Sequence, residues 1–289
     1  MSLRDMRPLR SEETGMSYLL TGEADAPLVV CLHGFPDIPR TWDPLTNALV
    51  RAGFRVVSPW LPGYAPSSLE GSLDPPAVVR RLLALIGELS PDAPVRLAGH
   101  DWGAILAHVA LSQRPELFRA AAILSIPHPL VLRRNVGDFP RQLLRSSYMA
   151  LFQLPAVPER VIRARDFAFV EWLWNIWSPG FSPGADYFDE LKQCLRASLP
   201  APLCYYRSLR SPEIIRELGA ILQTDPIPVP SLYLHGERDG CMGVELIDGQ
   251  ERYFSALFKT VRLAEAGHFV HLERPEEVNR AIVEWFLAH

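Results

Sequence analysis

Short apolar runs alternate with segments that carry apolar residues at helical spacing along most of the chain. Such runs are typical of strands buried on both faces of a parallel sheet, and the segments between them predict covering helices. We expect strands at residues 16–21, 27–32, 54–59, 95–99, 120–125, 231–234 and 260–263. We expect helices at residues 42–52, 75–88, 104–114, 249–258 and 275–287. The pattern therefore predicts an α/β fold with a mainly parallel sheet and helices on both faces.

The alternation is interrupted between residues 126 and 230. This region is helix-prone, contains many prolines and three tryptophans, and holds no apolar strand run. It ends in the sequence Asp-Pro-Ile-Pro-Val-Pro, which cannot form a regular helix because proline lacks the N–H donor. We expect a helical lid inserted between two strands. The predicted division is a core domain at residues 1–127 and 229–289, with a helical cap or lid at 128–228.

Composition excludes several classes of function. The 289-residue chain has a formal net charge of −4, whereas nucleic-acid binding requires a basic face. The four cysteines have neither metal-binding spacing nor the arrangement of a small disulfide-rich domain, so we expect free thiols. Residues 1–15 lack the apolar segment of a signal peptide, and no run is apolar enough to span a bilayer. We expect a cytoplasmic protein without a membrane or nucleic-acid partner. The sequence leaves open whether the protein forms a homodimer.

A small-residue turn joins the predicted strand at 95–99 to the helix at 104–114. Gly99 and Gly103 lie two residues on either side of Asp101. Such a strand-to-helix corner pushes its central residue out of the sheet, as a nucleophile elbow does. A carboxylate at that position suits attack on an electrophilic sp3 carbon, which gives a covalent alkyl ester. The alternative is that Asp101 is an ordinary helix N-cap.

Two further polar sites follow predicted strands near the C-terminus. Asp239 lies in the string HGERDG, and His268 lies in AGHFVH. Open α/β sheets bind their ligands at this edge. The order Asp101, Asp239, His268 is the nucleophile–acid–histidine order of the α/β-hydrolase triad. Glu237 stays an alternative acid, and His271 stays an alternative histidine.

The same motif predicts the two backbone N–H groups that would stabilise an oxyanion. One donor is the N–H of the residue after the nucleophile, here Trp102, and the other comes from the loop after an early strand. Phe35, in the string HGFPD, is the candidate for the second donor. The alternative for this string is an ordinary Gly-Pro turn.

The strings HGFPD, GHDWGA, HGERDG and AGHFVH make the chain resemble the epoxide hydrolase branch of the α/β-hydrolases, which is related to the haloalkane dehalogenases. The resemblance runs from about residue 18 to the C-terminus and implies an α/β-hydrolase fold with an inserted helical lid. It also implies two lid tyrosines that hold and protonate the epoxide oxygen. Tyr148, four residues before a Phe-Gln pair, and Tyr206, in a Tyr-Arg pair after Pro-Leu, match both positions. Tyr205 is the neighbouring alternative.

The resemblance implies an enzyme that converts an apolar epoxide to a vicinal diol through an ester on Asp101, using water and neither a metal nor an organic cofactor. The expected substrate-binding residues are Phe35, Trp102, Tyr148, Tyr206 and Trp172. A haloalkane or haloacid dehalogenase is the first alternative. Those enzymes commonly have an Asn in place of Phe35, or arginines directly after the nucleophile, and this chain has neither. A non-catalytic ligand-binding protein on the same fold is the second alternative.

Overall fold

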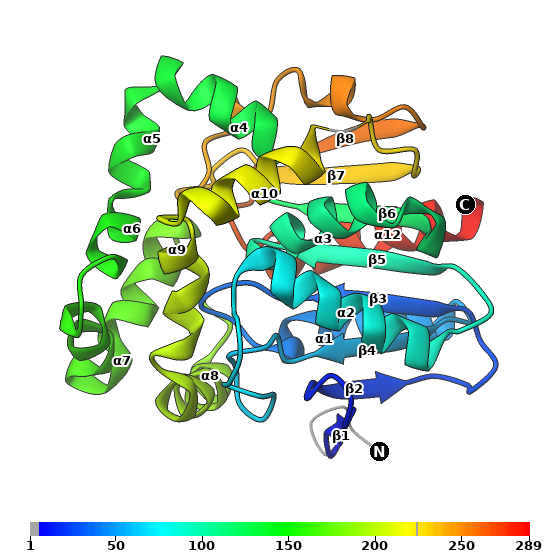
Figure 1. Cartoon of the computed structure of the whole chain (residues 1–289), viewed down its shortest axis with the longest axis horizontal. Helices are drawn as coiled ribbons and strands as arrows, with labels where there is room; N and C mark the ends of the chain where they lie inside the picture. Colours follow the sequence, from blue (N-terminus) through cyan, green and yellow to red (C-terminus); the bar gives the residue numbers. More distant parts are fainter. Residues whose placement is uncertain (1–5, 224) are drawn as a thin grey trace.

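A computed structural model describes residues 6–223 and 225–289. Within these residues the strands form one eight-stranded sheet in the order β1-β2-β4-β3-β5-β6-β7-β8 (Figure 1). The strands are β1 Leu9–Arg10, β2 Ser17–Thr21, β3 Leu28–Leu32, β4 Arg55–Pro59, β5 Val95–His100, β6 Phe118–Leu124, β7 Ser231–Gly236 and β8 Phe258–Leu263. β2 is antiparallel to β1 and β4, whereas the pairs from β4 through β8 are parallel. The predicted mainly parallel sheet is confirmed.

Helices cover both faces of the sheet (Figure 1). They are α1 Asp43–Arg51, α2 Pro75–Leu89, α3 Trp102–Gln113, α11 Val270–Glu273 and α12 Pro275–Ala288. Alternate residues of β3 point to opposite faces, as the strand repeat requires. Val30 belongs to a hydrophobic cluster that includes α2 and α3, and Val29 belongs to a second cluster that includes α1 and α12. The core therefore consists of two apolar layers separated by the sheet.

The predicted helical insertion is present between β6 and β7. It consists of α4 Pro129–Asn135, α5 Pro140–Arg145, α6 Ser147–Phe152, α7 Val157–Trp177, α8 Ala185–Ser198, α9 Cys204–Ser208 and α10 Pro212–Leu222. These helices are called the helical insertion below. Most of them lie beyond the carboxyl end of the sheet, and α10 runs back toward α3 (Figure 1). Among the described residues, no helix combines the length and the apolar character needed to cross a bilayer.

The prediction of an α-helix at residues 249–258 is wrong. The structure has only short 3-10 turns in this part of the described chain, at Val244–Leu246 and Gln250–Tyr253, and β8 begins at Phe258. The N–H of Ile227 donates to the carbonyl of Tyr253, and the N–H of Ser255 donates to the carbonyl of Ile227. Tyr253 and Ser255 thus pair with the proline-rich segment at residues 225–230, called the return segment below, and their backbone groups are not available for a helix.

Candidate active site

The turn between β5 and α3 places Asp101 above the edge of the sheet. Asp101 has φ 51° and ψ −120°, a strained conformation outside the usual regions for a residue with a side chain. A Cβ atom at Gly103 would lie 2.1 Å from the carbonyl oxygen of Leu32, and one at Gly99 would lie 2.4 Å from the carbonyl oxygen of Gly103. The sharp turn therefore requires glycine at both flanking positions.

The Asp101 carboxylate faces two of the predicted partners. Its Oδ1 atom accepts a hydrogen bond from the Phe35 N–H at 2.7 Å, and its Oδ2 atom lies 3.5 Å from Nε2 of His268. A Cβ atom at Gly34 would lie 2.4 Å from the Asp101 side chain, so glycine allows this close approach. Asp101 occupies the N-cap position of α3, but its side chain accepts no hydrogen bond from the helix. The alternative of an ordinary capping side chain is therefore wrong.

His268 lies between two carboxylates. Its Nδ1 atom is 2.8 Å from Oδ2 of Asp239, a geometry in which Nδ1–H donates to the carboxylate. The other Asp239 oxygen accepts the N–H groups of Cys241 and Met242 at 2.7 and 2.8 Å, which fixes the carboxylate. Asp101, Asp239 and His268 are all buried. The structure therefore brings these three predicted residues together.

The two alternatives for this group lie elsewhere. Glu237 is exposed to solvent, on the turn after β7. His271 is buried, but its Nε2 atom bonds the Thr41 hydroxyl and its ring stacks on Trp42. Neither residue contacts the carboxylate of Asp101, so the geometry favours Asp239 as the acid and His268 as the histidine.

The charge on His268 is controlled by its neighbours. Burial, the largest single influence, lowers the pKa of His268, but the carboxylates of Asp239 and Asp101 together raise it to about 10. The net direction is upward because an imidazolium between two anions is stabilised by both of them. The protonation state of His268 therefore depends on whether Asp101 carries its negative charge.

The backbone of His268 is held by residues that the sequence analysis did not single out. Its carbonyl oxygen accepts hydrogen bonds from Nε2 of His100 at 2.9 Å and from the Ser125 hydroxyl at 2.6 Å. Ser125 directly follows β6 with a positive φ of 67°. His100 immediately precedes Asp101, and its position at a strand end was the available sequence signal.

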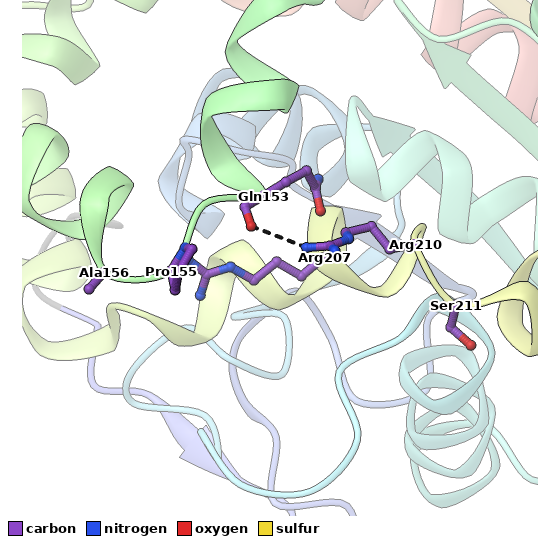
Figure 2. A pocket seen from close by; sticks show the side chains of 6 residues that line it. All are labelled: Gln153, Pro155, Ala156, Arg207, Arg210 and Ser211. Carbon is purple, nitrogen blue, oxygen red and sulfur yellow. Dashed lines mark hydrogen bonds between the residues drawn. The ribbon is translucent and has the colours of Figure 1, made fainter.

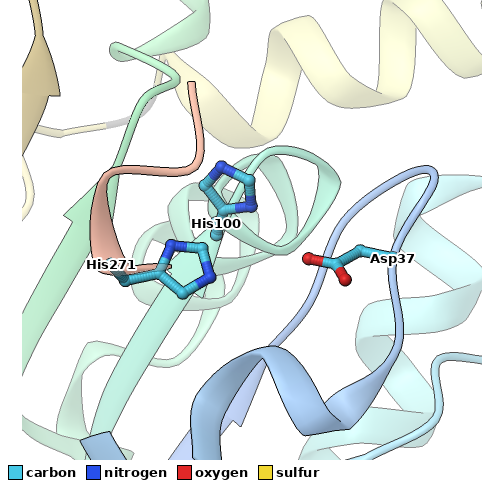
Figure 3. Close-up of side chains that lie close together, drawn as sticks. All are labelled: Asp37, His100 and His271. Carbon is cyan, nitrogen blue, oxygen red and sulfur yellow. The ribbon is translucent and has the colours of Figure 1, made fainter. Parts of the chain in front are cut away.

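Two groups of side chains in the described chain could present ligand atoms to a metal ion. In each group one N, O or S atom per residue lies within 4.8 Å of the others: Asp37, His100 and His271, and Asp101, Cys241 and His268. In the first group the Asp37 carboxylate points toward the two imidazole rings (Figure 3). Burial raises the pKa of Asp37 to about 7, and burial together with the nearby His268 lowers that of His271 to about 3. Asp37 belongs to the HGFPD string, but the string does not indicate that Asp37 is buried beside His100 and His271, because tertiary packing brings these three residues together.

A cavity of about 460 Å³ opens onto Asp101. Its walls are mostly apolar and come from the core and from the helical insertion: Trp102, Ile105, Ile126, Leu130, Leu132, Val136, Met149, Leu209, Ile215, Leu218, Leu222 and Met242. Tyr148 and Tyr206 line the same cavity. An apolar substrate can therefore reach the carboxylate of Asp101 with both tyrosines beside it.

The two tyrosine hydroxyls are suited to donate protons. The ring centroids of Tyr148 and Tyr206 are 5.9 Å apart. The Tyr206 hydroxyl is buried, and its ring packs against Trp102 and Tyr148, whereas the Tyr148 hydroxyl lies 3.7 Å from the sulfur of Cys241. Burial raises the pKa of both tyrosines well above the usual value, so both stay protonated at neutral pH.

Tyr205, the neighbouring alternative, has a different role. Its hydroxyl donates to the carbonyl of Pro62 at 2.7 Å, and it is not among the residues that line the cavity. This contact satisfies the only donor of the buried side chain. The geometry therefore favours Tyr206 as the residue that faces Asp101.

Hydrogen bonds between α6 and α9 bring the two cavity tyrosines together. The Gln153 amide donates to the carbonyl of Tyr206 at 3.1 Å, and Nε of Arg207 donates to the carbonyl of Phe152 at 3.0 Å. Arg210 adds a bond to the carbonyl of Gln153, drawn as a dashed line in Figure 2. The Phe-Gln and Tyr-Arg pairs of the sequence are thus the residues that join these two segments.

Two of the predicted substrate-binding residues do not line this cavity. Trp172 is 50% exposed, packs against Phe169 and does not line the cavity. The ring of Phe35 does not line it either, because it packs against Phe152 and Tyr206. The backbone N–H of Phe35, by contrast, faces the Asp101 carboxylate.

Comparison with known proteins agrees with this architecture. The model of the alpha/beta hydrolase family matches residues 29–281. The AB hydrolase superfamily protein YfhM of Bacillus subtilis (strain 168) is 31% identical over 271 residues, which cover 91% of each chain. Epoxide hydrolase 3 of Xenopus tropicalis is 29% identical and covers 97% of this chain and 78% of its own.

Solved structures give the same result for the fold. The crystal structure of the epoxide hydrolase VrEH1 from Vigna radiata superposes with a TM-score of 0.82 at 26% identity, over 100% of both chains. The sequence resemblance to the epoxide hydrolase branch is in line with these relatives. Because the family model covers most of the sheet and both of its helical layers, this chain belongs to the alpha/beta hydrolase family.

Proposed function

We propose that this protein is an epoxide hydrolase that converts an apolar epoxide to a vicinal diol, with Asp101 as the nucleophile. One observation carries the proposal: an aspartate at the elbow shares an apolar cavity with two buried tyrosine hydroxyls. A carboxylate can open a strained ring at carbon, and tyrosine can protonate the oxygen that leaves. The epoxide hydrolases among the relatives of this chain support the same activity.

In the first step, a carboxylate oxygen of Asp101 attacks one epoxide carbon. A carbon–oxygen bond of the ring breaks, and the electron pair moves to the ring oxygen. Tyr148 and Tyr206 hydrogen-bond this oxygen, and one of them donates a proton as it becomes an alkoxide. The product is a hydroxyalkyl ester of Asp101, which no longer carries a negative charge.

Loss of the Asp101 charge prepares His268 for the second step. The carboxylate of Asp101 is one of the two anions that raise the pKa of His268. After esterification only Asp239 remains charged beside the ring, so the imidazole releases a proton more readily. This proton balances the one that the tyrosine gave to the alkoxide, and neutral His268 becomes a base for water.

In the second step, His268 removes a proton from water, which attacks the carbonyl carbon of the ester. The oxyanion that forms is stabilised by the N–H groups of Phe35 and Trp102, and Asp239 stabilises the imidazolium. Contact between the Phe35 N–H and Oδ1 of Asp101 supports this assignment. As the intermediate collapses, the ester C–O bond breaks, the imidazolium protonates the departing alkoxide, and the diol leaves. The new carboxylic acid of Asp101 then returns a proton to His268, which restores the starting charges. The reaction requires neither a metal nor an organic cofactor.

We further propose that residues 128–228 act as a cap domain on the core formed by 1–127 and 229–289. The cavity supports this division, because residues of both parts line it. The cap would supply Tyr148 and Tyr206 together with most of the apolar wall. It would thereby exclude bulk water from the cavity while Asp101 attacks the epoxide and a tyrosine protonates the ring oxygen.

A single-turnover experiment in heavy-oxygen water tests the proposal. With enzyme in excess, the diol should contain no label, because its new oxygen comes from Asp101. The label should then appear in the Asp101 carboxylate, measured by mass spectrometry of the peptide that contains it. Labelled diol in the first turnover would contradict the covalent route. Halide release from haloalkanes, with no turnover of epoxides, would support a dehalogenase instead.

A further inference from the structure

The C-terminal end of α7 lies between the loops that carry Asp239 and His268. Trp177 is the last residue of α7, where helix carbonyls have no partner within the helix. Its carbonyl oxygen accepts the N–H of Gly240 and the N–H of His268, each at 3.0 Å. One carbonyl of the helical insertion is therefore bonded to both loops.

Ser178, the next residue, extends this contact. Its buried hydroxyl accepts the N–H of Phe269 at 3.1 Å and donates to Oε1 of Glu273 at 2.6 Å. The second Glu273 oxygen accepts the N–H of Gly267 at 2.7 Å. The backbone N–H groups on both sides of His268 are thus fixed by Ser178 and Glu273, and that of His268 itself by Trp177.

Close backbone packing accompanies these hydrogen bonds. A Cβ atom at Gly267 would lie 2.6 Å from Cα of Ser178, and one at Gly240 would lie 1.9 Å from the carbonyl oxygen of Ile176. Aromatic contacts support the same interface. The ring of Trp177 packs edge-on against His268, with centroids 5.2 Å apart, and Trp174 stacks on Phe269 at 3.5 Å.

We infer that Ser178 is a positioning residue for His268 in the water-activation step. The inference rests on the proposed two-step reaction, in which only the second step uses His268 as a base. Removing the Ser178 hydroxyl leaves the Phe269 N–H without its acceptor and Oε1 of Glu273 without the Ser178 donor. The loop can then move, and a displacement of about 1 Å at a reacting group can cost about 100-fold in rate.

Kinetics of Ser178→Ala in the full-length protein test this role. We expect kcat for epoxide hydrolysis to fall about 10- to 100-fold, because ester hydrolysis slows. KM should fall in proportion, because kcat/KM reports steps through alkylation, which do not need His268. The alkyl-enzyme should accumulate, as measured by intact-protein mass spectrometry during turnover.

Ser182→Ala is the matched control. Ser182 is exposed and bonds only the N–H of Gly184 within the described chain, so its kinetics should equal those of the wild type. A general loss of folded enzyme in Ser178→Ala would lower kcat and kcat/KM together and leave KM unchanged. That result, or wild-type kinetics, would overturn the inference.

Glu273 provides a second pair of variants. Glu273→Gln keeps an oxygen for the Gly267 N–H, and its amide N–H₂ can donate to the Ser178 hydroxyl, which then acts as the acceptor. It should therefore lose less kcat than Glu273→Ala. Glu273→Ala should behave like Ser178→Ala. Equal loss of kcat in the two variants would contradict a positioning role that depends on these hydrogen bonds.

A substrate-free measurement separates this inference from the proposed function. The Nδ1 proton shared by His268 and Asp239 should give a downfield proton NMR signal in the wild type, and Ser178→Ala should shift or broaden it. An unchanged signal would overturn the inference. Absence of diol formation from every epoxide by the wild type would overturn the proposed function, while the NMR comparison would still test Ser178.

Discussion

Nε2 of His268 lies 3.5 Å from Oδ2 of Asp101, whereas Nδ1 lies 2.8 Å from Oδ2 of Asp239. The imidazole thus has one close and one longer contact with an anion. The close contact orients the ring, and the longer one directs Nε2 at the carboxylate that the proposed reaction esterifies. In the proposed reaction, His268 is therefore already directed at the ester before that ester forms.

The rate of ester hydrolysis should rise with pH. His268 must be neutral to accept a proton, and its pKa in the free enzyme is raised to about 10 by Asp239 and Asp101 despite the opposing effect of burial. Esterification removes the charge of Asp101, so the apparent pKa of the hydrolysis step should lie below that value. Rapid-quench measurement of alkyl-enzyme decay across pH would check this.

Asp239→Asn should move the same rise in rate to still lower pH, because the second anion beside His268 is also lost. Its plateau should be lower, because the imidazolium that forms during hydrolysis loses its stabilising partner. An alkyl-enzyme decay rate that falls as pH increases would contradict the assignment of His268 as the base.

His268→Gln should separate the two chemical steps. Attack by Asp101 does not need the imidazole, so the variant should still form the ester but should not hydrolyse it. Intact-protein mass spectrometry should then show an increase equal to the mass of the epoxide. Asp101→Asn combined with His268→Gln should show no increase. An adduct on the double variant would place the reactive group elsewhere.

Replacing both cavity tyrosines should remove the acid. Tyr148→Phe with Tyr206→Phe should lower kcat/KM for an epoxide by about 100-fold or more, the usual contribution of general acid catalysis. Tyr205→Phe is the matched control. It should leave kcat/KM close to the wild-type value and cost about 1 kcal/mol of stability, because the Pro62 carbonyl loses its buried donor. A stronger kinetic effect of Tyr205→Phe would reverse the assignment.

The strained turn around Asp101 can be tested by stability alone. Gly103→Ala should destabilise the protein by at least about 1–3 kcal/mol, because the new Cβ atom would overlap the Leu32 carbonyl and force the backbone to shift. Gly87→Ala is the control. Gly87 lies in α2 with no atom within 4 Å of an added Cβ, so the change should stabilise the helix by up to about 1 kcal/mol. Denaturant unfolding of the two variants would provide the comparison.

Features that depend on local sequence were predicted well. The parallel strands follow from their apolar runs, and α2 begins at residue 75 as predicted, with Asp74 accepting the N–H of Ala77 as its N-cap. The positions of Asp101, Asp239 and His268 follow from residues next to strand ends, because neighbouring parallel strands end at the same edge of the sheet. The position of each residue at this edge depends on strand order and direction and not on the packing of side chains.

Features that depend on packing between distant segments were missed. The orientation of Trp172 could not be read from helical spacing, because residues 164–167 interrupt the regular dihedrals of α7 and shift the phase of the helix. The ring of Phe35 is covered by Phe152 and Tyr206, which are more than a hundred residues away in the sequence. The segment at 249–258 pairs with the return segment near Ile227, a contact that its own composition does not indicate.

The contact of α7 with the loops of Asp239 and His268 has a consequence for protein engineering. Grafting the insertion of a relative onto this core, to change the range of accepted molecules, would also replace the groups bonded to the N–H atoms of Gly240, His268 and Phe269. A successful chimera must therefore retain the end of α7 and Ser178 from the parent. Exchange junctions placed beyond that point, toward α8, would leave this part of the scaffold intact.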